Sequence, residues 1–253
     1  MLKTVDYDRS QHQTYVAGRD LGRDHALFWA RHFADHAPTP RPLSVLDLGS
    51  GTGRFTPILA ETFGEALGVE PSVQMRRIAE GHDTDPKVRY AAGRAEAIPA
   101  PDAAFDLVLM FLSFHHVKDR QKAVAEIARV LRPGGRVMMR SPFSDRFPAI
   151  DWHDFFPRAR EIEMRMFPPL AEVEALFAAV GLGRVALVEA EERMAGSLKE
   201  QAERLRHRAI STFEHLREAE IEEGFAQLDR AVAEEIEPKP AFTRADLLVL
   251  GEN

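Results

Sequence analysis

The 253-residue sequence predicts an α/β fold built on a doubly wound parallel sheet, and three observations support that prediction. Short apolar runs with the composition of buried strands alternate with amphipathic helical segments from Leu43 to Arg140. Glycine or proline follows several of these segments, as expected where an element ends. A glycine-rich loop directly follows the first apolar run. Such alternation places successive strands parallel in one sheet, joined by right-handed crossovers.

The elements up to the fifth strand can be assigned in chain order. Residues 1–42 are predicted as an N-terminal helical arm, which three prolines after His36 bring to an end. Strands are expected at Ser44–Leu48, Ala66–Glu70, Val88–Ala92, Phe105–Phe111 and Arg136–Arg140. Helices are expected at Arg54–Phe63, from Ser72 to Glu80, and at Lys118–Leu131, the last with apolar residues at i, i+3, i+4 and i+7.

The last third of the chain departs from this alternation. Residues 143–167 are rich in Phe, Pro and Arg and are predicted to form an excursion from the fifth strand. After it we expect a helix at Leu170–Val180, a strand at Arg184–Glu189, amphipathic helices along Leu198–Leu216 and Ile221–Ile236, and a terminal strand at Asp246–Leu250. Neither amphipathic stripe sustains heptads, which favours a helical pair packed on the sheet or arm over a coiled coil.

The composition excludes several classes of function. The 33 basic residues against 40 acidic ones give a net charge of −7, which disfavours duplex nucleic acid as a partner. The absence of cysteine excludes disulfides, thiolate zinc sites and cysteine nucleophiles. The longest apolar run, Phe105–Phe114, is too short to span a bilayer, and the polar N-terminus is unlike a signal peptide. We therefore expect a cytoplasmic protein that binds neither nucleic acid nor membrane.

The most informative segment is the loop after the first strand. Gly49, Gly51 and Gly53 stand at alternate positions, so the backbone can turn sharply there and approach a ligand closely. Glu70 ends the second strand, about 20 residues further on, where an α/β nucleotide-binding fold places a carboxylate for the ribose hydroxyls. The loop and the acid together predict a nucleoside-containing ligand.

Asp47, two residues before the first glycine, distinguishes between two such ligands. Its carboxylate would repel the pyrophosphate of a dinucleotide, and the spacing of the glycines is not GxGxxG. S-adenosylmethionine carries no phosphate, and its ammonium group suits a nearby carboxylate. The residues therefore favour S-adenosylmethionine, while an NAD-dependent oxidoreductase remains the competing hypothesis.

Four segments resemble successive motifs of the class I S-adenosylmethionine-dependent methyltransferases, of the broad type 11 small-molecule group. They are VLDLGSGTGRF, GVEPS, GRAEAIPAPDAAFDLVL and RVLRPGGRVMM, and the resemblance covers roughly residues 43–142. It implies a Rossmann-like, mostly parallel sheet of seven strands, in which an antiparallel strand at Asp246–Leu250 completes the set. It also implies S-adenosyl-L-methionine as cofactor and methyl transfer to a small molecule as the activity.

The resemblance further implies which residues bind the cofactor. The residues expected around its methionine and ribose parts are Asp47, Gly49, Gly51, Gly53 and Glu70. Those expected near the adenine are Pro71, Ser72, Ala95 and Glu96, and those near the sulfonium are Met110 and Phe111. Arg94 stands where many relatives carry an acidic residue. Tyr15 and Arg19 of the arm are candidates for a lid over the cofactor.

The candidates for catalysis are His115 and His116, which follow the fourth strand at the edge where open α/β sheets bind ligands. Either could act as a general base near pH 7. The alternative is that the second holds the loop and the first only faces the pocket. No acidic cluster resembles the magnesium site of catechol-type enzymes, so in-line displacement without a metal ion is expected.

The motifs that the sequence lacks narrow the chemical class of the acceptor. The chain lacks the Asn/Asp-Pro-Pro-Tyr motif after the fourth strand and lacks cysteine, which leaves a small organic molecule as the expected acceptor. The aromatic and arginine side chains of residues 143–167, Trp152 and Phe155 among them, could form the roof of its pocket or simply pack on the C-terminal helices. A non-catalytic S-adenosylmethionine-binding scaffold and an RNA methyltransferase remain further alternatives.

The expected organisation has three parts. Residues 1–42 form the arm or lid, and residues 43–142 form the cofactor-binding core. Residues 143–253 add the acceptor-side excursion, the helical pair and the closing strands to the same domain.

Overall fold

The computed structural model describes residues 8, 18, 22–82 and 85–252. The chain divides into two compact units. The first, called here the sheet unit, is built from Gly22–Ser141, Leu170–Val188 and the residues from Asp246 onward. The second, called here the helical unit, is built from Pro142–Pro169 and Glu189–Ala245. Each unit is described by itself below.

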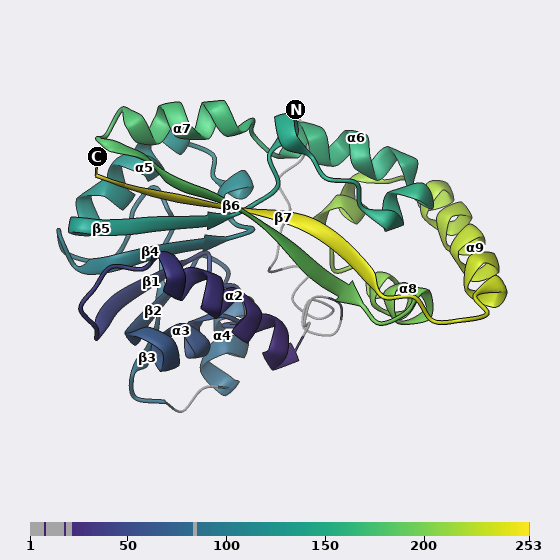
Figure 1. Ribbon diagram of the computed structural model, residues 1–253, viewed down its shortest axis with the longest axis horizontal. Helices are drawn as coiled ribbons and strands as arrows, with labels where there is room; N and C mark the ends of the chain where they lie inside the picture. Colours follow the sequence, from purple (N-terminus) through teal and green to yellow (C-terminus); the bar gives the residue numbers. More distant parts are fainter. Residues whose placement is uncertain (1–7, 9–17, 19–21, 83–84, 253) are drawn as a thin grey trace. The chain divides into compact units, whose positions relative to one another are not determined.

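The described residues form a seven-stranded sheet, which confirms the predicted fold class (Figure 1). The strands lie in the order β3-β2-β1-β4-β5-β7-β6. Their bounds are β1 Leu43–Leu48, β2 Gly64–Glu70, β3 Val88–Ala92, β4 Phe105–Phe111, β5 Leu131–Arg140, β6 Leu182–Ala195 and β7 Ala241–Glu252. Pairing from β3 through to β5 is parallel, and β7 runs antiparallel to β5 with Met139 opposite Leu248.

The strand order reverses beside β1, which places the glycine loop at the switch point of the sheet. β1 lies between β2 and β4, and the connections leave it in opposite directions. Ligands of open α/β sheets bind in the crevice that this reversal opens at the carboxyl ends of the strands. The loop after Leu48 is therefore at the position where such a fold binds its ligand.

Helices cover both faces of the sheet. α2 (Gly22–His36) packs on α3 (Thr56–Phe63), and α5 (Arg120–Val130) packs on α7 (Leu170–Ala178), on opposite sides in Figure 1. α4 (Val73–His82) lies beside β3. The core between them is aliphatic and aromatic, with Leu46, Leu107 and Trp29 fully buried.

Local chemistry accounts for the helix starts. α5 begins at Arg120 and not at the predicted Lys118, because Asp119 is its N-cap and accepts a hydrogen bond from the Lys122 N–H at 3.0 Å. α3 begins at Thr56, two residues later than predicted, and has a proline in its first turn. Of the helical arm predicted over residues 1–42, the structure describes the helix α2 from Gly22 to His36.

The helical unit contains α6 (Pro157–Met166), α8 (Leu198–Leu205), α9 (Glu218–Glu234) and three short 3₁₀ turns. The prediction of one helix along Leu198–Leu216 is wrong. α8 ends at Leu205, Arg208 adopts a φ of 50°, and a 3₁₀ turn follows at Ser211–His215. An arginine with positive φ interrupts helical hydrogen bonding, so the apolar stripe continues across a break in the backbone.

Aromatic side chains form the core of the helical unit. Trp152 stacks on Phe213 with ring centroids 5.6 Å apart, and Phe156 meets Phe213 and Phe225 edge to face. All four are less than 10% exposed and belong to one hydrophobic cluster. Of the two alternatives for the excursion, packing on the C-terminal helices is the one found for Trp152 and Phe156.

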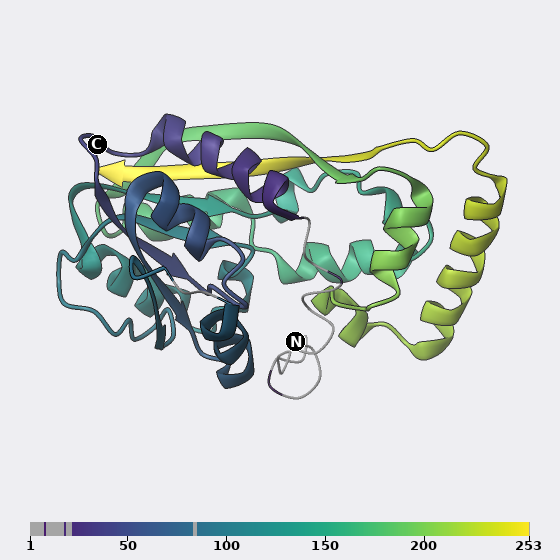
Figure 2. The same cartoon turned by 90° about the horizontal axis from the view of Figure 1, so that it is seen from below.

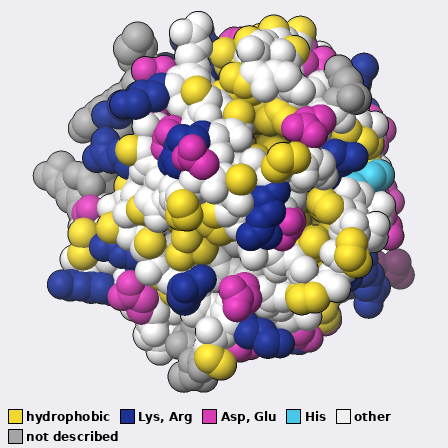
Figure 3. Space-filling model, turned by 90° about the vertical axis from the view of Figure 1, so that its left-hand side faces the viewer, with side chains coloured by type: hydrophobic (Ala, Val, Ile, Leu, Met, Phe, Trp, Pro, Cys, Tyr) yellow, Lys and Arg dark blue, Asp and Glu magenta, His cyan; other side chains and the backbone are white. Residues whose placement is uncertain are grey.

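The end of the molecule that faces the viewer in Figure 3 carries acidic and basic side chains in mixture, without a continuous basic patch. Among the described residues, no helix is long and apolar enough to cross a membrane.

Candidate functional site

The glycine loop after β1 adopts three positive φ angles: 82° at Gly49, 57° at Gly51 and 79° at Gly53. A Cβ on Gly49 would lie 2.5 Å from the Cβ of Ser113, and one on Gly53 would collide with the Tyr90 hydroxyl. A Cβ on Gly51 would meet only the Met75 methyl, at 3.9 Å. Gly49 and Gly53 are therefore required by packing, whereas at Gly51 it is the positive φ angle that favours glycine.

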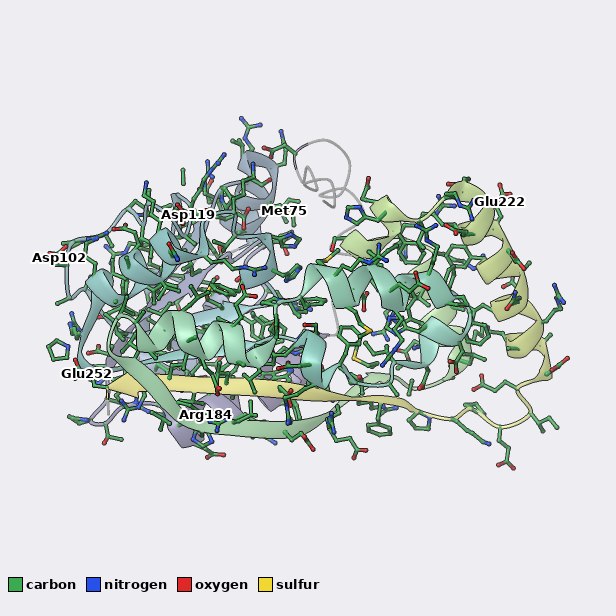
Figure 4. The ribbon with its side chains drawn as sticks, turned by 90° about the horizontal axis from the view of Figure 1, so that it is seen from above. Met75, Asp102, Asp119, Arg184, Glu222 and Glu252 are labelled. Atoms are coloured by element: carbon green, nitrogen blue, oxygen red, sulfur yellow. The ribbon has the colours of Figure 1, made fainter. Side chains whose placement is uncertain are left out.

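The Tyr90 side chain packs against this loop at Gly53. It was not among the predicted site residues. Its ring, from β3, also lies 2.5 Å from where a Cβ of Gly68 would stand on β2. Met75 reaches the loop from α4, the helix that carries its label in Figure 4. The contact of Tyr90 with two glycines arises from strand register, for which the sequence gives no local signal.

Glu70 is fixed at the carboxyl end of β2 by three hydrogen bonds. Its Oε2 accepts the Gly51 N–H at 3.0 Å and its Oε1 accepts the Ser72 N–H at 2.8 Å. Arg76 donates to the backbone carbonyl of Glu70 at 2.9 Å. These contacts orient the buried carboxylate of Glu70 at the end of the strand.

Asp47 is buried at the carboxyl end of β1, with 2% of its surface exposed. The Thr56 hydroxyl donates a hydrogen bond to its Oδ2 at 2.7 Å. Burial raises the pKa of Asp47 from 3.8 to about 6, against the opposing effects of the Thr56 hydrogen bond and the nearby Arg54 charge. Thr56, at the start of α3, is a site residue that the sequence did not indicate.

The raised pKa of Asp47 predicts that Asp47→Asn stabilises the protein at neutral pH. Between pH 3.8 and 6 the native state holds more protons than the unfolded state, so the ionised aspartate costs an increasing amount as pH rises, reaching about 3 kcal/mol above pH 6. Asparagine avoids this cost and keeps an acceptor for Thr56. Urea unfolding should show the gain at pH 7.5 and little gain at pH 4. An equal gain at both values would contradict the prediction.

The segment after β4 joins the loop to the histidine pair. Leu112 has a φ of 53°, a strained conformation for leucine, and its N–H donates to the Arg140 carbonyl at 2.9 Å. The Ser113 hydroxyl donates to the Leu48 carbonyl at 2.8 Å, which ties the ends of β1 and β4 together. The rings of His115 and His116 then lie 3.9 Å apart in a 3₁₀ turn, and both are partly exposed.

Hydrogen bonds within the protein fix the segment around Ala95 and Glu96, which is expected to lie near the adenine. Glu96 Oε1 accepts the N–H groups of Lys118 and Asp119 at 3.1 and 3.3 Å, so its carboxylate bridges two loops. Arg129 donates to the carbonyls of Ile98 and Ala100, at 3.1 and 2.9 Å. Sequence reasoning missed Arg129, because its contacts join residues about 30 positions apart.

The other predicted site residues are placed as follows. Pro71 is exposed, Ser72 and Ala95 are buried, and Met110 is 1% exposed. The Phe111 ring stacks on Phe55 at 4.1 Å, so it packs within the sheet unit. Tyr15 and Arg19 lie outside the described residues.

Within the described ranges, no group of three or more His, Asp or Glu residues is arranged to hold a metal ion.

Comparison with known proteins finds a family match for the residues that form this site. Residues 46–139 match the family described as "Methyltransferase domain". An uncharacterised methyltransferase, YcgJ, of Bacillus subtilis is 31% identical over 171 residues, which cover 66% of this chain and 64% of that protein. A demethylmenaquinone methyltransferase of Thermus thermophilus is 37% identical over 119 residues, covering 45% of this chain and 53% of that one. The match thus spans less than two thirds of either relative.

A solved structure shows the same fold. A putative methyltransferase from an antibiotic biosynthesis pathway of Anabaena variabilis superimposes with a TM-score of 0.69 at 23% identity. The match covers 88% of this chain and 96% of that one, so it includes elements of both units.

Proposed function

We propose that this chain, whose residues 46–139 match a methyltransferase family, is a class I S-adenosylmethionine-dependent methyltransferase that transfers the methyl group to a small organic acceptor. The observation that carries the proposal is the glycine turn at the switch point of the sheet, held at Gly51 by the fixed carboxylate of Glu70. Glu70 would accept the ribose hydroxyls, and Asp47 supplies the negative charge that suits the donor's ammonium group. The residues present therefore fit this cofactor.

The chain's own residues have a limited chemical task in this reaction. Bound S-adenosylmethionine supplies a methyl carbon that its positive sulfur already activates. The protein therefore chiefly has to bind and orient the donor and the acceptor and to exclude water from them. The glycine loop and Glu70 fix the donor. In the transfer the acceptor atom would bond to the methyl carbon, the sulfur would keep the electron pair of the broken bond, and a proton on the acceptor would pass to a base. His115 or His116 is the proposed base.

The proposal is tested by donor binding and by methyl transfer to metabolites. Calorimetry should show binding of S-adenosylmethionine and of S-adenosylhomocysteine, and no binding of NAD. Mass spectrometry should then detect metabolites that gain one methyl group when protein and donor are added to a cell extract. The assay should work equally well in EDTA, since the proposed transfer uses no metal ion. Binding of NAD alone would contradict the proposal, and donor binding without any transfer would support a scaffold.

The two histidines can be separated by single substitutions. We expect His115→Ala or His116→Ala to lower kcat by roughly 10²-fold or more if that residue is the base, because general-base catalysis contributes at that level. The loss should be largest above the pKa of the histidine, where the wild-type imidazole is neutral. The measurement is the pH profile of kcat for both variants on the identified acceptor. A small loss that is equal at every pH would mean that the ring only packs.

A further inference from the structure

A groove of 710 Å³ opens on the helical unit. Its walls are the start of α8, the end of α9 and the segment from Glu235 to Ala241 that leads into β7, with Asp151 from a 3₁₀ turn. All of these residues belong to one unit, so the groove is complete within it. The donor-binding residues described above belong to the other unit, which means that their role does not account for this groove.

Three carboxylates in the groove lack partners. Asp151, Glu234 and Glu237 make no ion pair or side-chain hydrogen bond with any residue that the structure describes. Other acids of α9 are paired with arginine: Glu218 with Arg208, Glu220 with Arg217 and Asp229 with Arg206. The one cation in the lining is Lys239. The groove is therefore strongly negative, although arginines neutralise much of the adjoining helix.

A fourth carboxylate, Glu235, holds one wall of the groove in place through hydrogen bonds. It accepts the N–H groups of Leu198 and Lys239 at 3.0 and 3.2 Å, and these hydrogen bonds lower its pKa. Glu235 thus fixes the segment after α9 against the start of α8. Two of the three unpaired carboxylates, Glu234 and Glu237, lie on this wall, and the third, Asp151, lies on a 3₁₀ turn. None of the three makes an ion pair or side-chain hydrogen bond that ties it to the described part of the chain.

An independent observation at the same place is the amide of Gln201. Its residue is 7% exposed and lines the groove, yet its side chain makes no hydrogen bond to any part of the chain that is described. The fold does not use this amide, so it is available to bond to a ligand in the groove or to water. Gln201 offers both a donor and an acceptor, as a peptide unit requires.

The side chain of Ile236 stands beside these groups with 96% of its surface exposed. Leu198 adds a further aliphatic surface to the lining. A ligand that covers Ile236 and Leu198 would remove this apolar surface from water. A small polyamine would satisfy the carboxylates but would leave Ile236 in water.

We propose that this groove binds a short basic peptide segment of a partner protein, in which lysine or arginine alternates with aliphatic side chains. The basic groups would meet Asp151, Glu234 and Glu237, the aliphatic ones would cover Ile236, and the Gln201 amide would pair with the peptide backbone. The inference goes beyond methyl transfer and does not depend on it.

The test uses a fluorescein-labelled eight-residue peptide of alternating lysine and leucine, with binding followed by fluorescence anisotropy. The double variant Glu234→Gln/Glu237→Gln should weaken binding at least tenfold, and Gln201→Leu and Ile236→Ser should each weaken it severalfold. The matched control is Glu222→Gln/Glu223→Gln, which removes the same charge from α9. Glu222 is labelled in Figure 4 and lies about 18 Å along the helix from Glu234.

The control pair should leave the affinity within about twofold. Equal losses in both double variants would overturn the proposal, because the peptide would then sense only net charge. A peptide of alternating lysine and serine that binds equally well would overturn it too, as would spermidine that displaces the labelled peptide at equal concentration of positive charge. Either result would assign the groove to a simple polycation. Circular dichroism of each variant confirms that the fold is intact.

Discussion

Glu70→Ala is expected to weaken binding of S-adenosylmethionine by tens to several hundred fold. In the proposed binding mode the substitution removes the acceptor of two hydrogen bonds to the ribose, which together are on the order of 2–4 kcal/mol because the carboxylate is charged. It also releases the N–H groups of Gly51 and Ser72, which now bond to the same carboxylate. Both effects act in the same direction, because a loosened loop must be ordered again when the ligand binds.

Calorimetry on the purified protein measures this effect. Glu65→Ala is the matched control, since Glu65 lies near the other end of β2 and, among the described residues, its side chain makes only a surface ion pair with Arg89 at 3.9 Å. Gly51→Val should abolish binding by a separate route, because valine would be strained at a φ of 57° and would distort the loop that the proposal assigns to the donor. Unchanged affinity in both Glu70→Ala and Gly51→Val would refute the assigned donor site.

Trp152→Ala is expected to lower the free energy of unfolding of the helical unit by about 3–5 kcal/mol, the range found for buried aromatic residues. Trp152 is 5% exposed and its ring contacts Phe156 and Phe213, so alanine would leave a cavity in the aromatic cluster. Donor affinity measured below the unfolding transition should change little, because Asp47, Gly51 and Glu70 belong to the sheet unit.

The measurement is denaturant unfolding followed by far-ultraviolet circular dichroism, which reports helix content and does not rely on tryptophan fluorescence. Phe242→Ala is the control in the same unit, since that ring is 45% exposed and its removal should cost about 1 kcal/mol or less. Wild-type stability of Trp152→Ala, combined with poor use of the acceptor, would instead support the sequence-based alternative in which this ring contacts the acceptor.

Elements governed by local pattern were predictable from the sequence, and those governed by distant contacts were not. The bounds of β4 at Phe105–Phe111 were predicted residue for residue, because an apolar run between polar neighbours is a local signal. The break after Leu205 was not, since the apolar stripe continues through Arg208 and gives no sign that the backbone turns there. Periodicity records which side chains are buried, whichever backbone conformation buries them.

The candidate site divides in the same way. The glycines and Glu70 could be found because a nucleoside ligand demands those residue types at that spacing. Thr56, Tyr90 and Ser113 could not be found, because each matters only through a residue on another strand or helix. Their roles become visible once strand register brings them under or beside the loop.

The position of Tyr90 has a consequence for how this sequence can change over generations. Gly68 has no unusual φ angle, so the Tyr90 ring and the Ser50 hydroxyl beside it are what exclude a side chain there. Gly68→Ala is therefore damaging while the ring is present and should become tolerable once a smaller residue replaces Tyr90, provided that Ser50 can turn aside. The two positions are epistatic, and the order of substitution matters. Alanine at position 68 should be tolerated when Tyr90 has already been replaced by a smaller residue, and should destabilise the fold when it arises first.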